Sequence, residues 1–294
     1  MAHPSPTAAR TVQPDHGKRI GMSVVMLRDD LETAARTIAE LGFDGMEVHV
    51  SHLGPGMPGV RVFEAHAAAC GELIRREGLL VSTLNLAGDQ AFDPLAGAEA
   101  YERSVGGLAT HLRLAAAMGA PRLLIWEGRL ARREDVPAAL TTLTRCIEEG
   151  RERSGLADPP PISLELHPFT LGLQHRVLPE LAAALVSVDA GICFDFCHFG
   201  VALGRELLDF LTDDVLAAID HVHYSDTDIV TSELHFPPGE GVLDLEAIGA
   251  RLAGKPIATS WDLFGWPSPR HAMRTTFDRY VAWVDRHRAS TGAP

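Results

Sequence analysis

Residues 191–200 read GICFDFCHFG, and this stretch decides the fold. Its large apolar residues, Ile192, Phe194 and Phe196, alternate with smaller or polar ones, which is the two-residue period of a buried strand. Asp195 lies on the opposite face, and a carboxylate on a buried strand is costly unless it is paired or binds a metal. Taken alone, the stretch fits a buried aspartate satisfied by hydrogen bonds equally well.

Three other strand-like stretches carry an acid or a histidine near their ends: SLELH at 163–167, HVHYSD at 221–226 and SWDLFG at 260–265. Outward from these, strand patterns alternate with amphipathic helix patterns, separated by Gly and Pro. The predicted strands are 19–26, one within 42–50, 79–86, 122–126, 162–166, 192–196, 221–225 and 257–263. The predicted helices are 31–41, 62–77, one within 93–118, 134–152, 178–186, 205–211, 243–252 and 270–287.

Eight strand-then-helix units predict a parallel sheet closed into a (β/α)8 TIM barrel. No change in composition marks a domain boundary, so residues 18–294 are predicted to be one barrel domain. Residues 1–17 are rich in Pro, Ala, Thr and His without periodicity, and are predicted to be a flexible N-terminal arm. A doubly wound open sheet is the alternative, but the chain lacks the G-x-G-x-x-G pattern that such folds often carry.

Composition limits the partners that can be expected. The formal net charge is −13, from 26 basic and 39 acidic residues, which argues against nucleic acid and anionic membranes. Four cysteines in 294 residues do not suggest a disulfide framework. No apolar run reaches transmembrane length, and the first residues lack the apolar core of a secretory signal. We therefore expect a cytoplasmic protein with a small-molecule substrate, either as a homo-oligomer or with a partner subunit.

In a TIM barrel the catalytic groups gather at the carboxyl ends of the strands, so polar residues near the predicted strand ends are expected to lie close together. Two or three carboxylates with one imidazole suit a divalent ion such as Mn²⁺, Mg²⁺, Co²⁺ or Zn²⁺. Such an ion polarises a carbonyl or hydroxyl and stabilises an enediolate. The residues that fall near predicted strand ends are Glu47, His49, Asn85, Glu127, Glu165, His167, Asp195, His198, His221, His223 and Asp262.

The chain resembles the sugar phosphate isomerase/epimerase superfamily of xylose-isomerase-like barrels over residues 19–288. The motifs are IAELGFDGMEVHV, MGAPRLLIWEG, ISLELHP, CFDFCHFG, HVHYSDTD, HFPPGEGVLD and SWDLFG, whose order is specific for the superfamily but not for a substrate. Tagatose-epimerase-like members bind one metal through Glu, Asp, His and Glu. The resemblance implies one ion, with Mn²⁺ first, on Glu165, Asp195, His223 and Asp262.

The resemblance also implies roles for single residues. The family usually has Glu where this chain has Asp262, and the shorter side chain would draw the metal toward strand eight or weaken its binding. Glu165 and Asp262 would act as the two proton-transfer bases. His198 resembles the histidine of a D-x-x-H motif that contacts substrate and is expected to take part in turnover. His167 would face substrate, and His235 would belong to a loop that closes over it.

Two further residues are expected to point into the barrel. Glu47 is expected either to bind substrate or to pair with a neighbour, and His221 is predicted to be a barrel-core histidine. Endonuclease IV resembles the chain at FDFCH and at residues 233–235, but its metal-binding histidines on strands three and four correspond here to Asn85 and Glu127. With a net charge of −13, DNA repair is not expected.

The functional prediction is a divalent-metal-dependent isomerase or epimerase acting on a ketose or polyol-derived ketone, by carboxylate-mediated proton transfer through an enediolate. A lyase on the same scaffold is the first alternative: a keto-inositol or dehydroshikimate dehydratase, or a glycoside-cleaving subunit. Both begin with the same proton abstraction, so the residues leave the two open. The second alternative is a metal-binding partner subunit without activity of its own.

Overall fold

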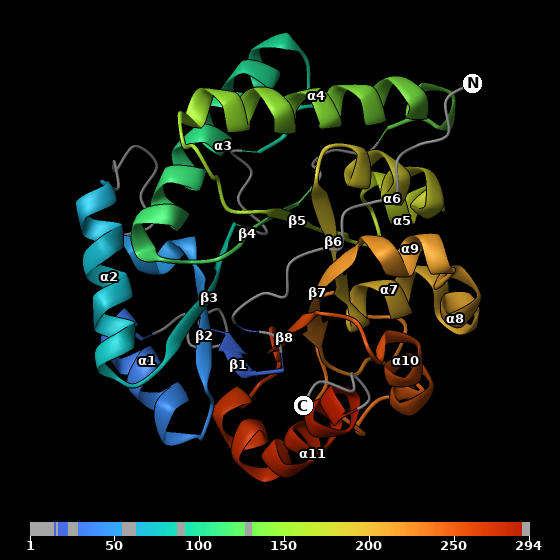
Figure 1. Cartoon of the computed structure of the whole chain (residues 1–294). Helices are drawn as coiled ribbons and strands as arrows, with labels where there is room; N and C mark the ends of the chain where they lie inside the picture. The colour runs from blue at the N-terminus through green and yellow to red at the C-terminus, as the bar shows by residue number, and fades with distance from the viewer. Residues whose placement is uncertain are drawn as a thin grey trace.

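The computed structural model describes residues 15, 17–22, 29–54, 63–86, 92–126 and 131–289. Within these residues, eight parallel strands pair in sequence order, and β8 returns to β1 to close a barrel (Figure 1). This confirms the predicted (β/α)8 TIM barrel. The strands are β1 (Arg19–Met22), β2 (Gly45–His49), β3 (Leu80–Asn85), β4 (Leu123–Trp126), β5 (Ile162–Glu165), β6 (Ala190–Asp195), β7 (Ile219–Tyr224) and β8 (Ala258–Trp261).

Helices surround the barrel on its outside (Figure 1). The longer ones are α1 (Leu31–Glu40), α2 (Glu64–Arg76), α3 (Ala98–Met118), α4 (Val136–Ser154), α6 (Leu178–Ser187), α10 (Leu245–Leu252) and α11 (Pro269–Ala289). Shorter helical segments are η2 (Val50–Leu53), η3 (Arg133–Asp135), α5 (Leu171–Gln174), α7 (Phe196–Leu203), η4 (Gly204–Glu206), α8 (Leu207–Phe210) and α9 (Asp213–Ala218). None of the helices in the described part of the chain is long and apolar enough to cross a membrane.

Strand β6 is buried on both faces, as its alternating residues predict. Phe194 packs outward, with its ring 4.4 Å from that of Phe199 in α7. The alternate residues Cys193 and Asp195 face the barrel interior. Asp195 pairs in register with His223 of β7, and paired residues of a sheet share a face. The register therefore projects Asp195 and His223 together at the carboxyl end of the barrel.

The prediction of a strand at 192–196 followed by a helix at 205–211 was wrong in detail. The strand ends at Asp195, and α7 begins at the next residue, Phe196. The reason is that the Asp195 side chain accepts a hydrogen bond from the backbone N–H of His198 at 2.8 Å and so caps the new helix. The period-2 apolar pattern concealed this helix because Phe196 remains buried in either conformation.

The amino-terminal end of the barrel holds a buried ion pair. Asp15 Oδ2 lies 3.1 Å from Arg122 Nη1, and both side chains are completely buried. The same oxygen accepts a hydrogen bond from Ser82 Oγ at 2.5 Å. Asp15 is thus an exception to the predicted flexible arm, because a buried arginine requires a counter-charge. Residues 1–14 and 16 of that predicted arm lie outside the described residues.

Candidate active site

Four side chains predicted as metal ligands meet where β5, β6, β7 and β8 end. His223 Nδ1 lies 2.8 Å from Glu165 Oε1 and 3.4 Å from Asp195 Oδ2. It lies 3.9 Å from Asp262 Oδ2. One potential ligand atom from each residue falls within 4.8 Å of all the others, and all four side chains are buried. This four-residue cluster, which could hold a metal ion, consists of Glu165, Asp195, His223 and Asp262.

The two aspartates of the cluster are held in the same way. Asp195 Oδ1 accepts the N–H of His198 at 2.8 Å, and Asp262 Oδ1 accepts the N–H of Phe264 at 2.7 Å. Their Oδ2 atoms are thereby directed toward the centre of the cluster. Asp195 Oδ2 is buried without a hydrogen-bond partner among the described residues. A buried carboxylate oxygen without a partner is costly, and a bound cation would remove that cost, so the residues fit a metal ion.

Glu47 lies beneath the cluster, inside the barrel. Its Oε1 accepts a hydrogen bond from Asn85 Nδ2 at 2.6 Å and lies 3.1 Å from His223 Nε2. Its Oε2 lies 2.7 Å from His221 Nε2 and accepts a hydrogen bond from Ser260 Oγ at 2.8 Å. In this structure Glu47 pairs with its neighbours, which is one of the two roles expected of it. The carboxylate is 1% exposed, and both oxygens already have two partners.

The position of Glu47 determines how His223 can act. Burial alone would raise the pKa of Glu47, but His223 and His221 reverse this effect and hold it well below its ordinary value. The ionised carboxylate favours a proton on His223 Nε2, while Nδ1 faces the cluster. Burial alone would lower the pKa of His223, but Glu47 and Glu165 raise it well above its ordinary value, so a metal at Nδ1 would displace a proton there. A carboxylate behind a histidine is the usual arrangement for orienting a metal-ligating imidazole.

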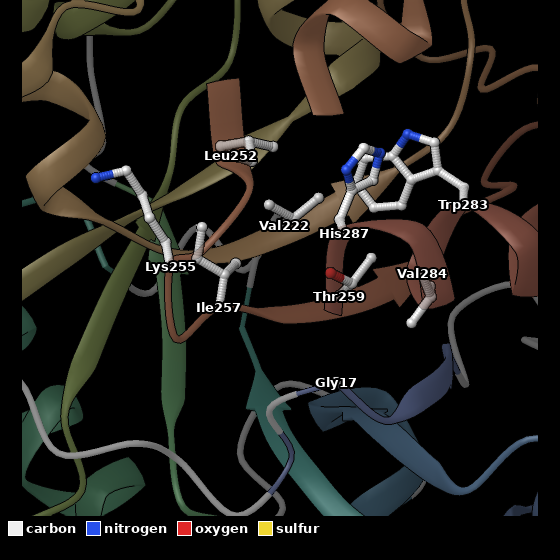
Figure 2. A pocket seen from close by; sticks show the side chains of 9 residues that line it. All are labelled: Gly17, Val222, Leu252, Lys255, Ile257, Thr259, Trp283, Val284 and His287. Atoms are coloured by element: carbon white, nitrogen blue, oxygen red, sulfur yellow. The ribbon is translucent and has the colours of Figure 1, made fainter. Parts of the chain in front are cut away.

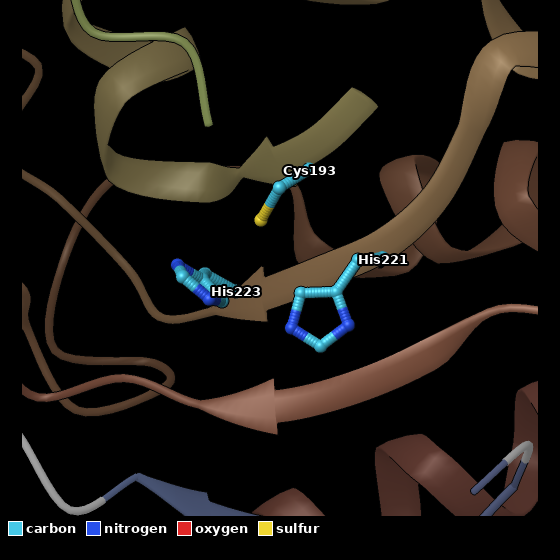
Figure 3. Close-up of side chains that lie close together, drawn as sticks. All are labelled: Cys193, His221 and His223. Carbon is cyan, nitrogen blue, oxygen red and sulfur yellow. The ribbon is translucent and has the colours of Figure 1, made fainter. Parts of the chain in front are cut away.

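A different set of atoms deeper in the barrel could also be considered as ligands. Figure 3 shows Cys193 of β6 beside His221 and His223 of β7, and the three come within 4.8 Å of one another. Burial raises the pKa of Cys193 well above its ordinary value, so the thiol stays protonated, whereas metals bind the thiolate. Both imidazoles also contact Glu47. These three residues are therefore less suited to binding a metal than the four-residue cluster is.

Three histidines predicted to face substrate lie in an arc next to the cluster. We call His167, His198 and His235 the histidine arc. The ring centroids of His167 and His198 are 4.0 Å apart, and those of His198 and His235 are 5.0 Å apart. His235 Nδ1 lies 2.8 Å from Asp262 Oδ2. The structure therefore brings the predicted ligands and the predicted substrate-side histidines together in one site.

The histidines of the arc differ in charge. Burial lowers the pKa of His198 well below its ordinary value, so this imidazole is neutral at physiological pH. At His235 burial is outweighed by Asp262 and Asp195, which raise the pKa well above the ordinary value. At His167 burial is likewise outweighed, here by Glu233 and Glu165, and the pKa is raised. The arc can thus both accept and donate a proton next to the cluster.

Two aromatic residues beside the arc were not predicted as site residues. The ring of Trp126 lies 5.5 Å from that of His167 in a T-shaped arrangement, and the ring of Phe169 also lies 5.5 Å from that of His167. Trp126 is the last residue of β4. Its register with Glu165 places both residues on one face, and strand pairing is the signal that could have revealed this. Together the two rings supply an apolar wall to the site.

Other predicted positions contribute less. His49 ends β2, and its Nδ1 contacts Ser51 Oγ at 2.7 Å. Asn85 supports Glu47, as described above, and Glu127 lies outside the described residues. A separate cavity of about 30 Å³ lies on the outer side of β7 and β8, between α10 and α11 (Figure 2). It has room for about one water molecule, so it does not compete with the cluster as a substrate site.

The fold and cluster define a TIM barrel whose carboxyl-end mouth could hold a metal ion. A family model for the xylose isomerase-like TIM barrel matches residues 35–277, and the chain belongs to this family. No curated protein matches the sequence.

Three similar solved structures illustrate the range of proteins with this fold. The probable 3-DHS dehydratase AsbF from Bacillus anthracis, involved in petrobactin synthesis, is 14% identical with a TM-score of 0.69, covering 90% of this chain and 98% of that one. The IolI protein, solved with a zinc atom bound, is 17% identical with a TM-score of 0.69, covering 92% and 99%. A D-tagatose 3-epimerase-like protein is 18% identical with a TM-score of 0.68, covering 92% and 98%. At these identities the likeness shows the fold alone.

Proposed function

We propose that this protein is a divalent-metal-dependent isomerase or epimerase that acts on a ketose or a polyol-derived ketone. The main support is the convergence of three carboxylates and one imidazole from four strand ends, with the unpartnered oxygen of Asp195 directed among them. Catalytic groups of TIM barrels lie at this end of the strands. The histidine arc beside the cluster supplies groups that can exchange protons with a substrate.

Glu165, Asp195, His223 and Asp262 would hold the ion. A donor set dominated by carboxylates favours Mn²⁺, with Mg²⁺, Co²⁺ and Zn²⁺ as alternatives. When bound, the ion would polarise the substrate carbonyl and make the neighbouring C–H more acidic.

Glu165 is the better placed of the two proposed bases. Its Oε1 is directed toward His223, while its Oε2 lies 3.9 Å from His167 Nε2, on the side of the histidine arc. Both oxygens of Asp262 are already engaged, one with the Phe264 N–H and the other near His235. We infer that Glu165 removes the proton alpha to the carbonyl, and that Asp262 with His235 returns a proton from the other side.

The remaining residues of the site would orient the substrate and exclude water. Trp126 and Phe169 offer aromatic faces against which the C–H side of a carbon skeleton can pack. His198, neutral and only 2% exposed, can accept a hydrogen bond from a substrate hydroxyl. The chain would thus bind a polyhydroxylated ketone by an apolar wall on one side and imidazoles on the other.

A lyase remains the alternative, and His235 is the observation that favours it. An imidazole whose pKa is raised by Asp262 and Asp195, in spite of burial, carries a proton that it could give to a leaving hydroxyl. In that reaction Glu165 would again remove the first proton. The product would then have lost water, whereas an isomerised product would have the mass of the substrate.

The function is tested by combining metal analysis with product analysis. The purified protein is expected to contain about one divalent ion per chain and to melt at a lower temperature after chelation, since a ligand bound only to the native state stabilises it. Mn²⁺ is then restored, and the protein is incubated with a panel of ketoses and keto-polyols in heavy water. Mass spectrometry should show an isomer of the substrate in which hydrogen has been replaced by deuterium from the solvent. A dehydrated product would establish the lyase. Absence of both metal and turnover would refute the proposal.

Metal affinity is expected to rise with pH. Burial alone would lower the pKa of His223, but Glu47 and Glu165 raise it well above its ordinary value, and this imidazolium stabilises the metal-free protein. This contribution is complete below the ordinary histidine pKa of about 6.5 and is lost as the pH rises through the higher folded value. A cation bound at His223 Nδ1 must displace that proton. Titration calorimetry at pH values of about 6 and about 8 should show tighter Mn²⁺ binding at the higher pH, with net proton release. Equal affinity at both would contradict the prediction.

A further inference from the structure

The segment between β7 and α10, residues 225–244, carries His235 to the four-residue cluster. We call it the β7–α10 loop. His235 is 1% exposed, and its Nδ1 lies 2.8 Å from Asp262 Oδ2 and 3.9 Å from Asp195 Oδ2. A side chain on a connecting loop keeps such a position only if the backbone of the loop is held.

The loop is closed around the carboxylate of Asp226. Its Oδ1 accepts the backbone N–H groups of Thr227 at 2.9 Å and Leu243 at 3.1 Å. Its Oδ2 accepts those of Gly239 and Gly241, each at 3.0 Å. One buried side chain thus joins the start of the loop to three positions near its end. Each oxygen receives two N–H donors, and charge-assisted hydrogen bonds of this kind are the strong ones.

The middle of the loop is fastened by other contacts. The backbones of Asp226 and Phe236 exchange two hydrogen bonds, at 2.8 and 2.9 Å. The N–H of His235 donates to the carbonyl of Phe264 at 3.0 Å, which ties the loop to the segment after β8. Cys197 Sγ lies 3.4 Å from the carbonyl of Ser232. The hydrogen bonds of Asp226 and these contacts together hold the backbone on both sides of His235.

We propose that Asp226 is a positioning residue that sets the place of His235 against Asp262, and through Asp262 the affinity of the cluster for a metal. The metal part rests on the proposed function, while the placement of His235 does not. Only a carboxylate meets the requirement, because four N–H donors converge on two oxygens. An asparagine offers one oxygen and would direct its own N–H₂ group at two of those donors.

The test uses three variants. Asp226→Asn replaces one carboxylate oxygen, the acceptor of two N–H groups, without changing the size of the side chain. Gly241→Ala keeps the carboxylate but adds a Cβ that collides with Asp226 Oδ1, so it disrupts the hydrogen bonds of Asp226 by another route. Asp244→Asn is the matched control. It removes the same charge from the same loop, but Asp244 only caps α10 by accepting the N–H of Ala247 at 2.9 Å.

The first measurement is metal-free. Diethyl pyrocarbonate labelling followed by mass spectrometry reports which imidazoles are accessible. His235 is expected to react in Asp226→Asn and Gly241→Ala but to stay protected in the wild type and in Asp244→Asn. His221, completely buried in the barrel and 2.7 Å from Glu47, should stay protected in every variant, which distinguishes a moved loop from a loosened fold. If His235 stays protected in both Asp226→Asn and Gly241→Ala, the proposal is overturned.

The second measurement is the affinity for Co²⁺ alone and the visible absorption of the bound ion. Loss of a side chain that supports a metal ligand typically weakens metal binding by about 10–100-fold. Asp226→Asn is expected to weaken Co²⁺ binding about tenfold and to shift the spectrum as His235→Ala does, and the double variant should be no weaker than His235→Ala. If the losses of Co²⁺ affinity in Asp226→Asn and His235→Ala add up in the double variant, Asp226 does not act through His235 and the proposal is refuted. If the wild type binds no Co²⁺ but Asp226→Asn exposes His235, the proposed function fails and the placement by Asp226 stands.

Discussion

Glu165→Gln, saturated with Mn²⁺, is expected to lower turnover by about three orders of magnitude, within the range that one general base contributes. The reason is that Glu165 Oε2 faces the histidine arc, 3.9 Å from His167 Nε2, while Oε1 is directed toward His223. The amide keeps the size of the side chain but cannot take a proton. The measurement is turnover together with solvent-deuterium exchange at the substrate carbon, with metal content determined on the same sample.

Asp262→Asn is the matched comparison for this prediction. Both Asp262 oxygens are engaged, so its loss should weaken the metal and stop the return of the proton, while exchange at the carbon that faces Glu165 persists. An aspartate is also shorter than glutamate by roughly one bond, about 1.5 Å, which limits its reach as a base. If Glu165→Gln retained exchange and Asp262→Asn abolished it, the roles of the two carboxylates would be reversed. Full turnover in Asp262→Asn with metal bound would leave a one-base reaction, as in the lyase.

Glu47→Gln is expected to lower the free energy of unfolding by about 3 kcal/mol and to weaken metal binding about 10–100-fold. Glu47 is the carboxylate shared by His221 and His223 in the barrel interior, at 2.7 and 3.1 Å. A glutamine has one acceptor oxygen and one N–H₂ group, so one of the two buried imidazoles loses its acceptor and the charge that favours a proton on His223 Nε2 is gone. The measurements are urea unfolding without metal and titration with Mn²⁺.

The pH dependence provides a further check on Glu47. Burial would raise the pKa of Glu47, but His223 and His221 lower it well below its ordinary value. Its stabilising contribution is therefore present above the ordinary glutamate pKa of about 4.3 and is lost as the pH falls through the lower folded value. Wild type and Glu47→Gln should converge in stability at acid pH. The control is Glu32→Gln, which removes an exposed pair with Arg36 and should cost only about 0.3–0.5 kcal/mol at any pH above that range.

Much of the architecture could be predicted from local pattern. The two-residue period of β6 and the 3–4-residue period of α1, where Leu31, Ala34 and Ile38 are buried, are properties of short segments. Eight such units specify a barrel, and barrel closure brings strand ends together. The meeting of Glu165, Asp195, His223 and Asp262 follows from that topology, which is why it could be predicted without knowing any distance.

What only the tertiary structure decided concerns contacts between side chains from different strands and loops. The amino-acid sequence by itself determined that Glu47 points inward, that an aspartate follows β8 and that a histidine lies in the β7–α10 loop. The fold decided that Glu47 supports His223, that Trp126 faces the mouth through its register with Glu165, and that His235 reaches Asp262. The physical reason is the distance along the sequence over which each kind of information acts. Periodicity reports which face of a segment is buried, whereas a hydrogen-bond partner far away in sequence depends on strand register, on loop closure around Asp226 and on which depth in the barrel each side chain reaches.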